Sequence, residues 1–405
     1  MGNSNVKKKY HDHQKYASQY SLIDIIGGSC AGSTRSSHVE IKSWSRTSSR
    51  SWNENYTFRD TVNSSKTAWP IPRFESIFLP EFKVRKTALI TEYSFLDIIA
   101  KGAYGRVYKV KNRETGQVFA LKVISKAKIV AENAIAQAKQ EVVIQRMVGH
   151  HPFIVNSTHR WQSRKTLYIL TDYMSGGELF SLVKECGCLP EEVVRIYVAE
   201  IALAIDFLHN AGVVHRDLKA TNILLDEEGH AVIIDFGLSK WLHRTQKTNT
   251  FCGTPEYMAP EIIKRQHYGQ EVDWWSLGVL MCFLLTNRYP SCAPCKYFSD
   301  RIDQNSPDPP GTLPANADLS SAATDLLKRL LQPDPKLRLR SILILETLAF
   351  YLGRNLKSYM YKKESPFKLL GRTYEPPKNN LTKEQMHHEF ADFDSFVTRY
   401  RNRTG

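Results

Sequence analysis

The octapeptide "HRDLKATN", His215 to Asn222, is the most informative part of the chain, because it holds a cation, a carboxylate, a lysine and an amide within eight residues. A second acidic motif, "DFG" at 235–237, follows the apolar segment "HAVII". One carboxylate can orient a hydroxyl group while the other holds a metal ion, and the lysine and the amide lie between them. This combination indicates phosphoryl transfer, since hydrolases that use paired carboxylates would not also require the lysine and the amide.

Further motifs stand in the order that phosphoryl transfer requires. The segment "AKGAYGRV" has Gly102 and Gly105 where backbone N–H groups can approach phosphates closely. Lys122 in "FALK" lies on a later predicted strand, and Glu141 lies on the predicted helix that follows, suitably placed to pair with it. The tripeptide "APE", 259–261, closes the segment that begins at "DFG". Each motif alone could be a turn, an exposed lysine or a solvated helix face, but the ordered set has no such ordinary explanation.

This ordered set resembles the eukaryotic protein kinase family over about residues 93–351. The resemblance implies an α+β, bilobal fold, in which a small β-sheet lobe carries one main helix, a larger lobe is helical, and ATP binds between them. Asp217 would accept or orient the substrate hydroxyl, and Lys219 would steady the transferring phosphate. Lys122, held by Glu141, would contact the α- and β-phosphates. Mg²⁺ would be held by Asp235 and Asn222.

The same resemblance assigns the rest of the site residue by residue. Asp172 and Met174 would contact adenine through backbone groups, and Thr171 would line the back of that pocket. The catalytic residues are then Arg216, Asp217, Lys219 and Asn222, and the nucleotide site comprises Ile99, Ala100, Gly102, Gly105, Val107, Ala120, Lys122, Glu141, Thr171, Asp172, Met174, Glu178 and Leu224.

Several motifs narrow the class of kinase. "HRDLK" and "TPEYMAPE" are similar to serine/threonine kinases rather than tyrosine kinases. "TFCGTPEYMAPE", "VDWWSLGVLM" and "GGELF" are similar to the AGC group. With "WPIPRFESIFLPEF" ahead of the domain, the overall pattern resembles the ribosomal protein S6 kinase-related branch. The expected reaction is ATP-dependent phosphorylation of serine and threonine hydroxyls on protein substrates, in intracellular signalling.

The resemblance also marks regulatory and supporting residues. Thr250, just before "FCGT", would be phosphorylated by an upstream activating kinase, and the roughly two added negative charges could recruit Arg216 and order the loop. A solvated loop threonine is the alternative at this position. Supporting roles fall on Thr254 at the acceptor site, Asp273 behind the catalytic loop, and a Glu261–Arg338 pair.

A short aromatic motif near the end of the chain, "EFADFDSF", resembles the AGC hydrophobic motif. In that family two aromatic side chains dock into a small-lobe groove beside the helix that carries Glu141, a role that falls here on Phe390 and Phe393. Asp394 occupies the place of the usual phosphorylated residue and would give the motif a permanent charge. An amphipathic C-terminal helix is the alternative reading.

The sequence departs from the family pattern at a few places. Ala100 replaces the first glycine of the loop, and we expect ATP binding to survive this change. Glu178 is retained, but Thr221 and Phe283 stand where acidic residues are frequent, so a preference for basic substrates is in doubt. The segment 287–311 is rich in Pro and Cys and matches the family poorly. These departures keep a second hypothesis open: a weak or inactive kinase-fold scaffold that binds nucleotide and protein partners.

The chain divides into segments of different amino-acid composition. Residues 1–68 are rich in Ser and Arg and are predicted to be disordered, and 69–92 form an aromatic and proline-containing lead-in, either extended against the folded body or a stiff linker. The kinase domain is expected at 93–352, with five strands and one helix in the small lobe (93–173) and a helical large lobe (174–352). Residues 353–405 form the predicted C-terminal tail.

Composition sets the remaining expectations. The 405 residues are 42% hydrophobic and carry a formal net charge of +14 that is spread rather than massed, and no motif supports nucleic-acid binding. Seven cysteines without even spacing favour a reducing compartment, so a cytoplasmic location is expected. The apolar run at 277–285 is too short to span a membrane and predicts a buried core helix. Gly2 with Lys7–Lys9 leaves open a reversible membrane attachment by acylation, against a plain basic tail.

Overall fold

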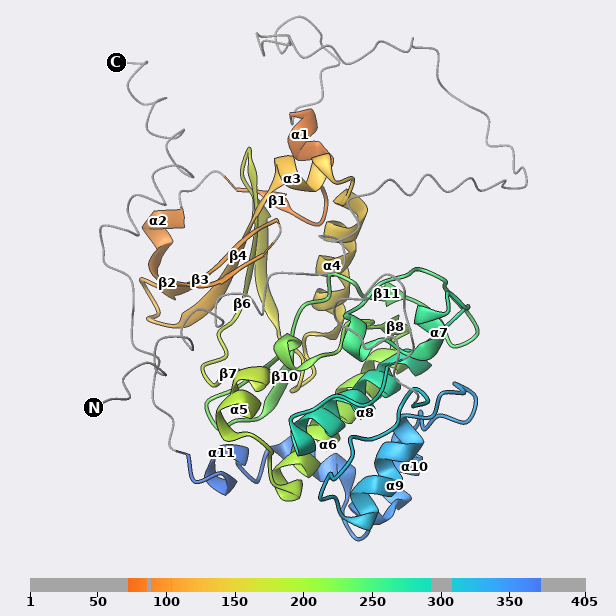
Figure 1. The fold of residues 1–405 in the computed structure, drawn as a ribbon. Helices are drawn as coiled ribbons and strands as arrows, with labels where there is room; N and C mark the ends of the chain where they lie inside the picture. Colours follow the sequence, from red (N-terminus) through yellow and green to blue (C-terminus); the bar gives the residue numbers. More distant parts are fainter. Residues whose placement is uncertain (1–71, 86–88, 103, 293–307, 373–405) are drawn as a thin grey trace, which may run out of the picture.

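The structure is a computed structural model that describes residues 72–85, 89–102, 104–292 and 308–372. Figure 1 shows two lobes, a β-sheet lobe with α4 beside it and a larger lobe built mainly from helices. The predicted disordered region, the acylation signal at Gly2 and Lys7–Lys9, and the C-terminal aromatic motif all lie outside the described residues. None of the helices in the described part of the chain is long and apolar enough to cross a membrane.

The small lobe is built on a six-stranded sheet in the order β1-β5-β6-β4-β3-β2. Neighbouring strands are antiparallel except for β1, which lies parallel to β5. The five strands predicted within 93–173 are present as β2 to β6, and the lead-in segment adds β1 as a sixth strand at the edge of the sheet. The strands are β1 (Lys83–Val84), β2 (Tyr93–Lys101), β3 (Gly105–Asn112), β4 (Val118–Ser125), β5 (Ser157–Gln162) and β6 (Thr166–Asp172).

The single helix predicted after β4 is two helices in the structure. Asn133 has a left-handed φ of 54°, a conformation that asparagine tolerates better than most residues, and it separates the two. Two shorter helices belong to the lead-in, which is therefore not simply extended. The helices of this lobe are α1 (Arg73–Ser76), α2 (Leu89–Glu92), α3 (Lys126–Ala131) and α4 (Ile135–Val148).

The large lobe is centred on two long helices. One apolar face of α6 (Glu191–Asn210) is fully buried and comprises Tyr197, Ile201, Ile205 and Leu208. The other helices are α5 (Leu179–Cys186), α7 (Pro260–Ile263), α8 (Glu271–Thr286), α9 (Ser321–Leu330), α10 (Ile342–Thr347) and α11 (Pro366–Leu369). Short strands β7 (Gly177–Glu178), β9 (Ile223–Leu225) and β10 (Ala231–Ile233) form one small sheet, and β8 (Val213–Val214) pairs with β11 (Lys240–Trp241).

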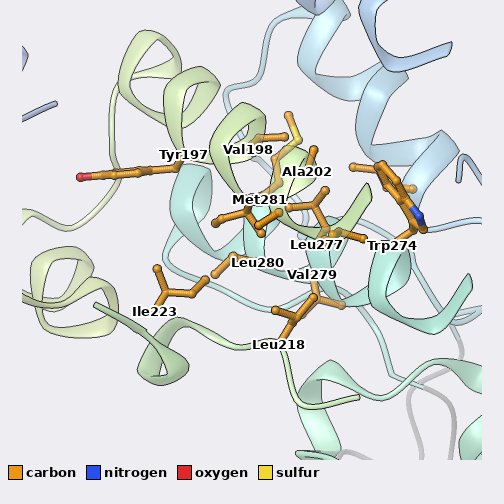
Figure 2. Close-up of a cluster of buried hydrophobic side chains, with 14 of the residues drawn as sticks. Tyr197, Val198, Ala202, Leu218, Ile223, Trp274, Leu277, Val279, Leu280 and Met281 are labelled. Atoms are coloured by element: carbon orange, nitrogen blue, oxygen red, sulfur yellow. The ribbon is translucent and has the colours of Figure 1, made fainter. Parts of the chain in front are cut away.

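Helix α8 is apolar on all sides and lies inside this lobe. Figure 2 shows Trp274, Leu277 and Met281 of α8 among side chains from α6 and from the loop that precedes β9. The segment 277–285 is thus a buried core helix, as predicted. A helix that is hydrophobic all round must be covered all round, and α8 accordingly packs against both α6 and α9.

Candidate active site

The loop between β8 and β9 carries "HRDLKATN", and Asp273 at the start of α8 holds its backbone. The Asp273 carboxylate accepts hydrogen bonds from the backbone N–H groups of His215 (2.9 Å) and Arg216 (2.8 Å) and from the His209 ring (2.9 Å). Burial alone would raise the pKa of Asp273, but these hydrogen bonds and the neighbouring histidines lower it. Arg216 takes a left-handed φ of 70°, so the fixed carboxylate supports a strained turn.

Asp217 lies at the centre of a group of polar side chains. Its carboxylate accepts a hydrogen bond from the Thr254 hydroxyl (2.7 Å) and pairs with the Lys219 ammonium (3.0 Å). The same ammonium donates to the Thr254 hydroxyl at 2.8 Å. The structure therefore brings together the three residues expected at the acceptor site, and it presents an alcohol to a carboxylate with a cation beside both.

Asn222 and Asp235 provide oxygen atoms next to this group. The Asn222 amide nitrogen donates to the Asp217 backbone carbonyl and to its carboxylate, both at 2.9 Å, which leaves the amide oxygen facing away from those bonds. The backbone N–H of Ile234 donates to the Asn222 carbonyl at 2.9 Å, which ties the end of β10 to this loop. A carboxylate and an amide oxygen are the hard ligands that Mg²⁺ prefers, so this donor set fits the expected metal.

The groups around the Asp235 carboxyl favour its negatively charged form. Burial would raise the pKa of its carboxyl, but the charge of Lys122, the backbone N–H of Gly237 and the charges of His215 and Lys219 lower it. Its backbone has a left-handed φ of 61°. Phe236, the next residue, is buried in the large lobe with its ring 5.2 Å from that of His215, so the "DFG" segment is anchored directly beside Asp235.

Lys122 on β4 pairs with Glu141 on α4, with 2.6 Å between the ammonium and carboxylate atoms. Burial would lower the pKa of Lys122, but Glu141 and Asp235 together raise it well above its usual range. On the same helix, Gln137 donates to the Gly237 carbonyl (2.7 Å) and Gln140 donates to the Ser239 carbonyl (2.8 Å). Helix α4 therefore joins the strand lysine to the "DFG" segment.

The other predicted nucleotide residues lie on the strands around Lys122. On β2 and β3, Ala100 pairs with Val107, which in turn lies opposite Lys122. A side chain at Gly105 would come within 1.8 Å of the Val123 carbonyl, so this glycine is required by strand packing as well as by the loop. The remaining positions are Ile99 and Gly102 at the end of β2, Ala120 on β4 opposite Thr171 on β6, Asp172 and Met174 at the link between lobes, and Glu178 and Leu224, which pair across β7 and β9.

Thr250 is exposed and does not contact Arg216 directly. Its carbonyl accepts a hydrogen bond from the Tyr268 hydroxyl (2.7 Å), and Arg216 donates to that hydroxyl at 3.4 Å. Its own hydroxyl lies 3.1 Å from that of Thr248, to which Lys240 donates at 2.9 Å. Arg216 and Lys240 are therefore each linked to Thr250 through one intermediate side chain, Tyr268 and Thr248 respectively.

Phe283, which stands where an acidic residue is frequent, belongs to an aromatic stack. Its ring lies 5.6 Å from Phe180 and 5.0 Å from Tyr289, both nearly parallel to it. Tyr289 then meets Tyr257 edge-on at 5.5 Å, and the Lys184 ammonium lies 5.4 Å above Phe283. The carboxylate expected by analogy is thus replaced by a packed apolar group.

The poorly matching segment 287–311 is described only at its two ends. The backbone N–H of Ser291 donates to the Thr312 carbonyl (2.9 Å), and that of Gly311 donates to the Ser291 carbonyl (2.8 Å). Tyr289, at the base of this segment, is part of the aromatic stack described above. Its described ends therefore adjoin the stack.

Some residues of the site were not predicted from the sequence. Gln137 and Gln140 stand four and one positions before Glu141, and the i, i+3 and i+4 spacing places all three on one helix face. That spacing could have identified Gln137. Lys240 and Tyr268 carried no local signal, because they reach Thr250 only through the fold. The bidentate Glu261–Arg338 pair, with atoms 2.6 and 2.9 Å apart and both side chains buried, does match its prediction.

Comparison with known proteins decides the family. The model of the protein kinase domain matches residues 93–348. The chain belongs to the protein kinase family. Several relatives are named serine/threonine-protein kinases, which supports the serine/threonine class for this chain, and the predicted bilobal fold is confirmed.

The relatives also support the predicted resemblance to the ribosomal protein S6 kinase-related branch. The chain is 38% identical over 285 residues to "Ribosomal protein S6 kinase-related protein" of Homo sapiens, covering 70% of this chain and 68% of the relative. It is 45% identical over 208 residues to "Protein kinase 2" of Dictyostelium discoideum (51% and 43%). It is 38% identical over 279 residues to the "RAC family serine/threonine-protein kinase homolog" of the same organism (68% and 62%). The matches thus span between about two fifths and two thirds of these relatives.

Proposed function

We propose that this kinase is catalytically active and transfers the terminal phosphate of ATP to serine or threonine hydroxyls through Asp217. The observation that carries the proposal is the Thr254 hydroxyl, held 2.7 Å from the Asp217 carboxylate and 2.8 Å from the Lys219 ammonium. A substrate hydroxyl in a similar position would be oriented by the carboxylate, and the ammonium would offset the charge of the phosphate.

The nucleotide would be held by groups that are already arranged. Lys122 would bind phosphate oxygens, and its pairing with Glu141 fixes the direction of the ammonium. Asn222 and Asp235 would hold Mg²⁺, which neutralises charge on the phosphates when it is bound. Ala100 still pairs with Val107 of β3, after a register shift between Ile98 and Ala100, and this retained pairing supports activity over the scaffold alternative.

We also propose how the kinase is regulated and how it attaches to membranes. An upstream kinase would phosphorylate Thr250, which is exposed and lies near Arg216 and Lys240. We further propose a cytoplasmic protein that reaches membranes through an acylated Gly2 and Lys7–Lys9. Incorporation of labelled myristate, lost in Gly2→Ala, tests this part.

The central test compares the full chain, phosphorylated at Thr250, with Asp217→Asn in the presence of ATP, Mg²⁺ and a generic protein substrate. Loss of the general base should lower kcat by about 10²–10⁴-fold. Asp325→Asn removes an exposed carboxylate on α9 and serves as the matched control. If wild type and Asp217→Asn transfer phosphate equally poorly, the scaffold hypothesis is the better one.

A further inference from the structure

The outer side of α4 is covered by the lead-in segment. Phe78 and Phe82 are fully buried in a cluster with residues of β4, α3, α4 and β6. Their rings are 6.5 Å apart and nearly perpendicular, and Phe74 lies 6.4 Å from Phe78 in the same way. The apolar residues that receive them are Ile124, Ile129, Ala134, Ala138, Val142, Leu167 and Ile169.

Polar contacts fasten the same segment to α4 and β5. Lys139 of α4 pairs with the Glu81 carboxylate (2.8 Å) and donates to the Leu79 carbonyl (2.6 Å). The buried Gln162 amide of β5 donates to the carbonyls of Glu75 (3.0 Å) and Phe82 (2.6 Å). The segment is therefore fixed at both ends and in its middle, as a specific part of the fold.

Helix α4 faces the active site on its other side. Glu141 pairs there with Lys122, and Gln137 and Gln140 bond to the backbone of the "DFG" segment. Ala138 and Val142, which contact the lead-in, alternate along the helix with these three residues. Any rotation or shift of α4 that releases Phe78 and Phe82 would also move Glu141.

We propose that residues 74–84, called the clip below, are a built-in positioning element that holds α4 so that Glu141 meets Lys122. The clip fills the small-lobe groove beside α4 into which the C-terminal Phe390 and Phe393 were expected to dock. Phe78 and Phe82 are positioning residues, and the kinase needs no C-terminal aromatic pair for this purpose. The inference rests on the proposed function, because it concerns the same Lys122–Glu141 pair.

The first test uses the full chain with Phe78→Ala and Phe82→Ala combined. We expect kcat to fall by about 5- to 150-fold, the usual range for coupling between two sites, and a synthetic peptide of residues 69–85 added in trans to restore it. Val143→Ala, at an exposed position on α4, is the matched control. Combined Phe390→Ala and Phe393→Ala should leave kcat within about twofold, as expected for groups outside the coupled unit.

A double-mutant cycle separates positioning from general stability. If the clip acts through Glu141, adding the two Phe→Ala changes to Glu141→Gln should lower kcat little further, whereas independent effects would multiply. Should the double Phe variant fail to fold, Glu81→Gln removes the ion pair with Lys139 and leaves the aromatic core in place. Multiplying effects, or a lack of rescue by the peptide, would overturn the proposal.

Hydrogen exchange of α4 amides gives a result that does not depend on activity. The clip variant should exchange faster than wild type over 135–148, and the peptide should restore protection. If wild type itself shows no transfer, the proposed function fails, while this exchange result still tests the clip. Loss of activity in the Phe390→Ala, Phe393→Ala variant with the clip variant unaffected would assign the groove to the C-terminal motif.

Discussion

At the level of single residues, the site depends on charges that are buried and then compensated. Asp235 and Asp273 keep a lowered pKa despite burial, because cations and N–H donors surround each carboxylate. Lys126 under the clip is the opposite case. It is fully buried against Gln162 and the rings of Phe74 and Phe78, and burial lowers its pKa to about 8, although Glu75 opposes this shift.

Lys126 therefore predicts a pH dependence of stability. Between pH 8 and its ordinary pKa of 10.5, the unfolded chain binds this proton and the folded chain does not, so its contribution to folding stability rises with pH in that window. Below pH 8 both states are protonated, and the cost of burying the charge is fully present. We expect the difference in unfolding free energy between wild type and Lys126→Met to change by up to about 3 kcal/mol from pH 7 to pH 10.5.

Denaturant unfolding at several pH values measures this difference, because other titrating groups cancel between the two proteins. Lys128→Met, at an exposed position on the same helix, is the control for removing a lysine side chain from α3. A constant difference for Lys126→Met would mean that Lys126 keeps its ordinary affinity for protons.

At the level of elements, the segment from "DFG" to "APE" is fixed by contacts from several parts of the chain. Arg216 donates to the Leu238 carbonyl at 2.7 Å, and Thr248 exchanges backbone hydrogen bonds with Tyr268 at 2.8 and 2.9 Å. A phosphate on Thr250 would lie near Arg216 and Lys240, which are each linked to this residue through one side chain, and it could form strong charge-assisted hydrogen bonds with them.

Thr250→Ala should therefore lower kcat by about 5- to 150-fold relative to the phosphorylated chain. Lys240→Gln should reduce the effect of phosphorylation without abolishing it, because Arg216 remains. Thr245→Ala, at another exposed position of the same segment, is the control and should leave kcat unchanged. Kinetics on protein of known phosphate content measure both effects, and equal activity with and without the Thr250 phosphate would contradict the prediction.

The sequence predicted elements well where their signal is local. Helices α6 and α8 follow from apolar periodicity and from a continuous apolar run, and the catalytic motifs lie on the expected elements. The break between α3 and α4 depends on one left-handed asparagine, and β1 forms by pairing with β5, where Lys83 lies opposite Trp161, 78 residues along the chain. The sequence also left open whether the clip lies against the folded body or is a stiff linker, because its partners Lys139 and Gln162 are distant in sequence.

At the level of the whole molecule, the lobes are joined through the groups that perform the chemistry. Lys122 of the small lobe and Asp235 beside the large lobe each stabilise the charged form of the other. Helix α4 also donates two side-chain hydrogen bonds to backbone carbonyls in and just after the "DFG" segment. A relative movement of the lobes would therefore disrupt several polar contacts together. Such coupling allows a change at the clip or at Thr250 to reach Asp217 without touching it.

The molecule's charge also bears on its choice of substrate. The formal net charge is +14, and the aromatic stack of Phe180, Phe283 and Tyr289 replaces a carboxylate that would attract arginine. Glu178 remains, but burial raises its pKa and Lys219 only partly offsets this. We therefore expect peptides with Arg or Ala ahead of the acceptor serine to differ in kcat/KM by no more than about fivefold, since an exposed ion pair contributes up to about 1 kcal/mol.

A peptide series with Arg, Ala, Glu or Phe at each position before the acceptor tests this expectation directly. Glu178→Gln should remove any remaining preference for Arg, measured as the ratio of kcat/KM for the Arg and Ala peptides, because an effect of the change on nucleotide binding cancels in this ratio. Peptides with Glu should lose more rate than those with Ala as salt rises, since the net positive charge attracts them at low ionic strength. A preference for Arg over Ala of a hundredfold or more would mean that another carboxylate takes the place of the one that Phe283 replaces.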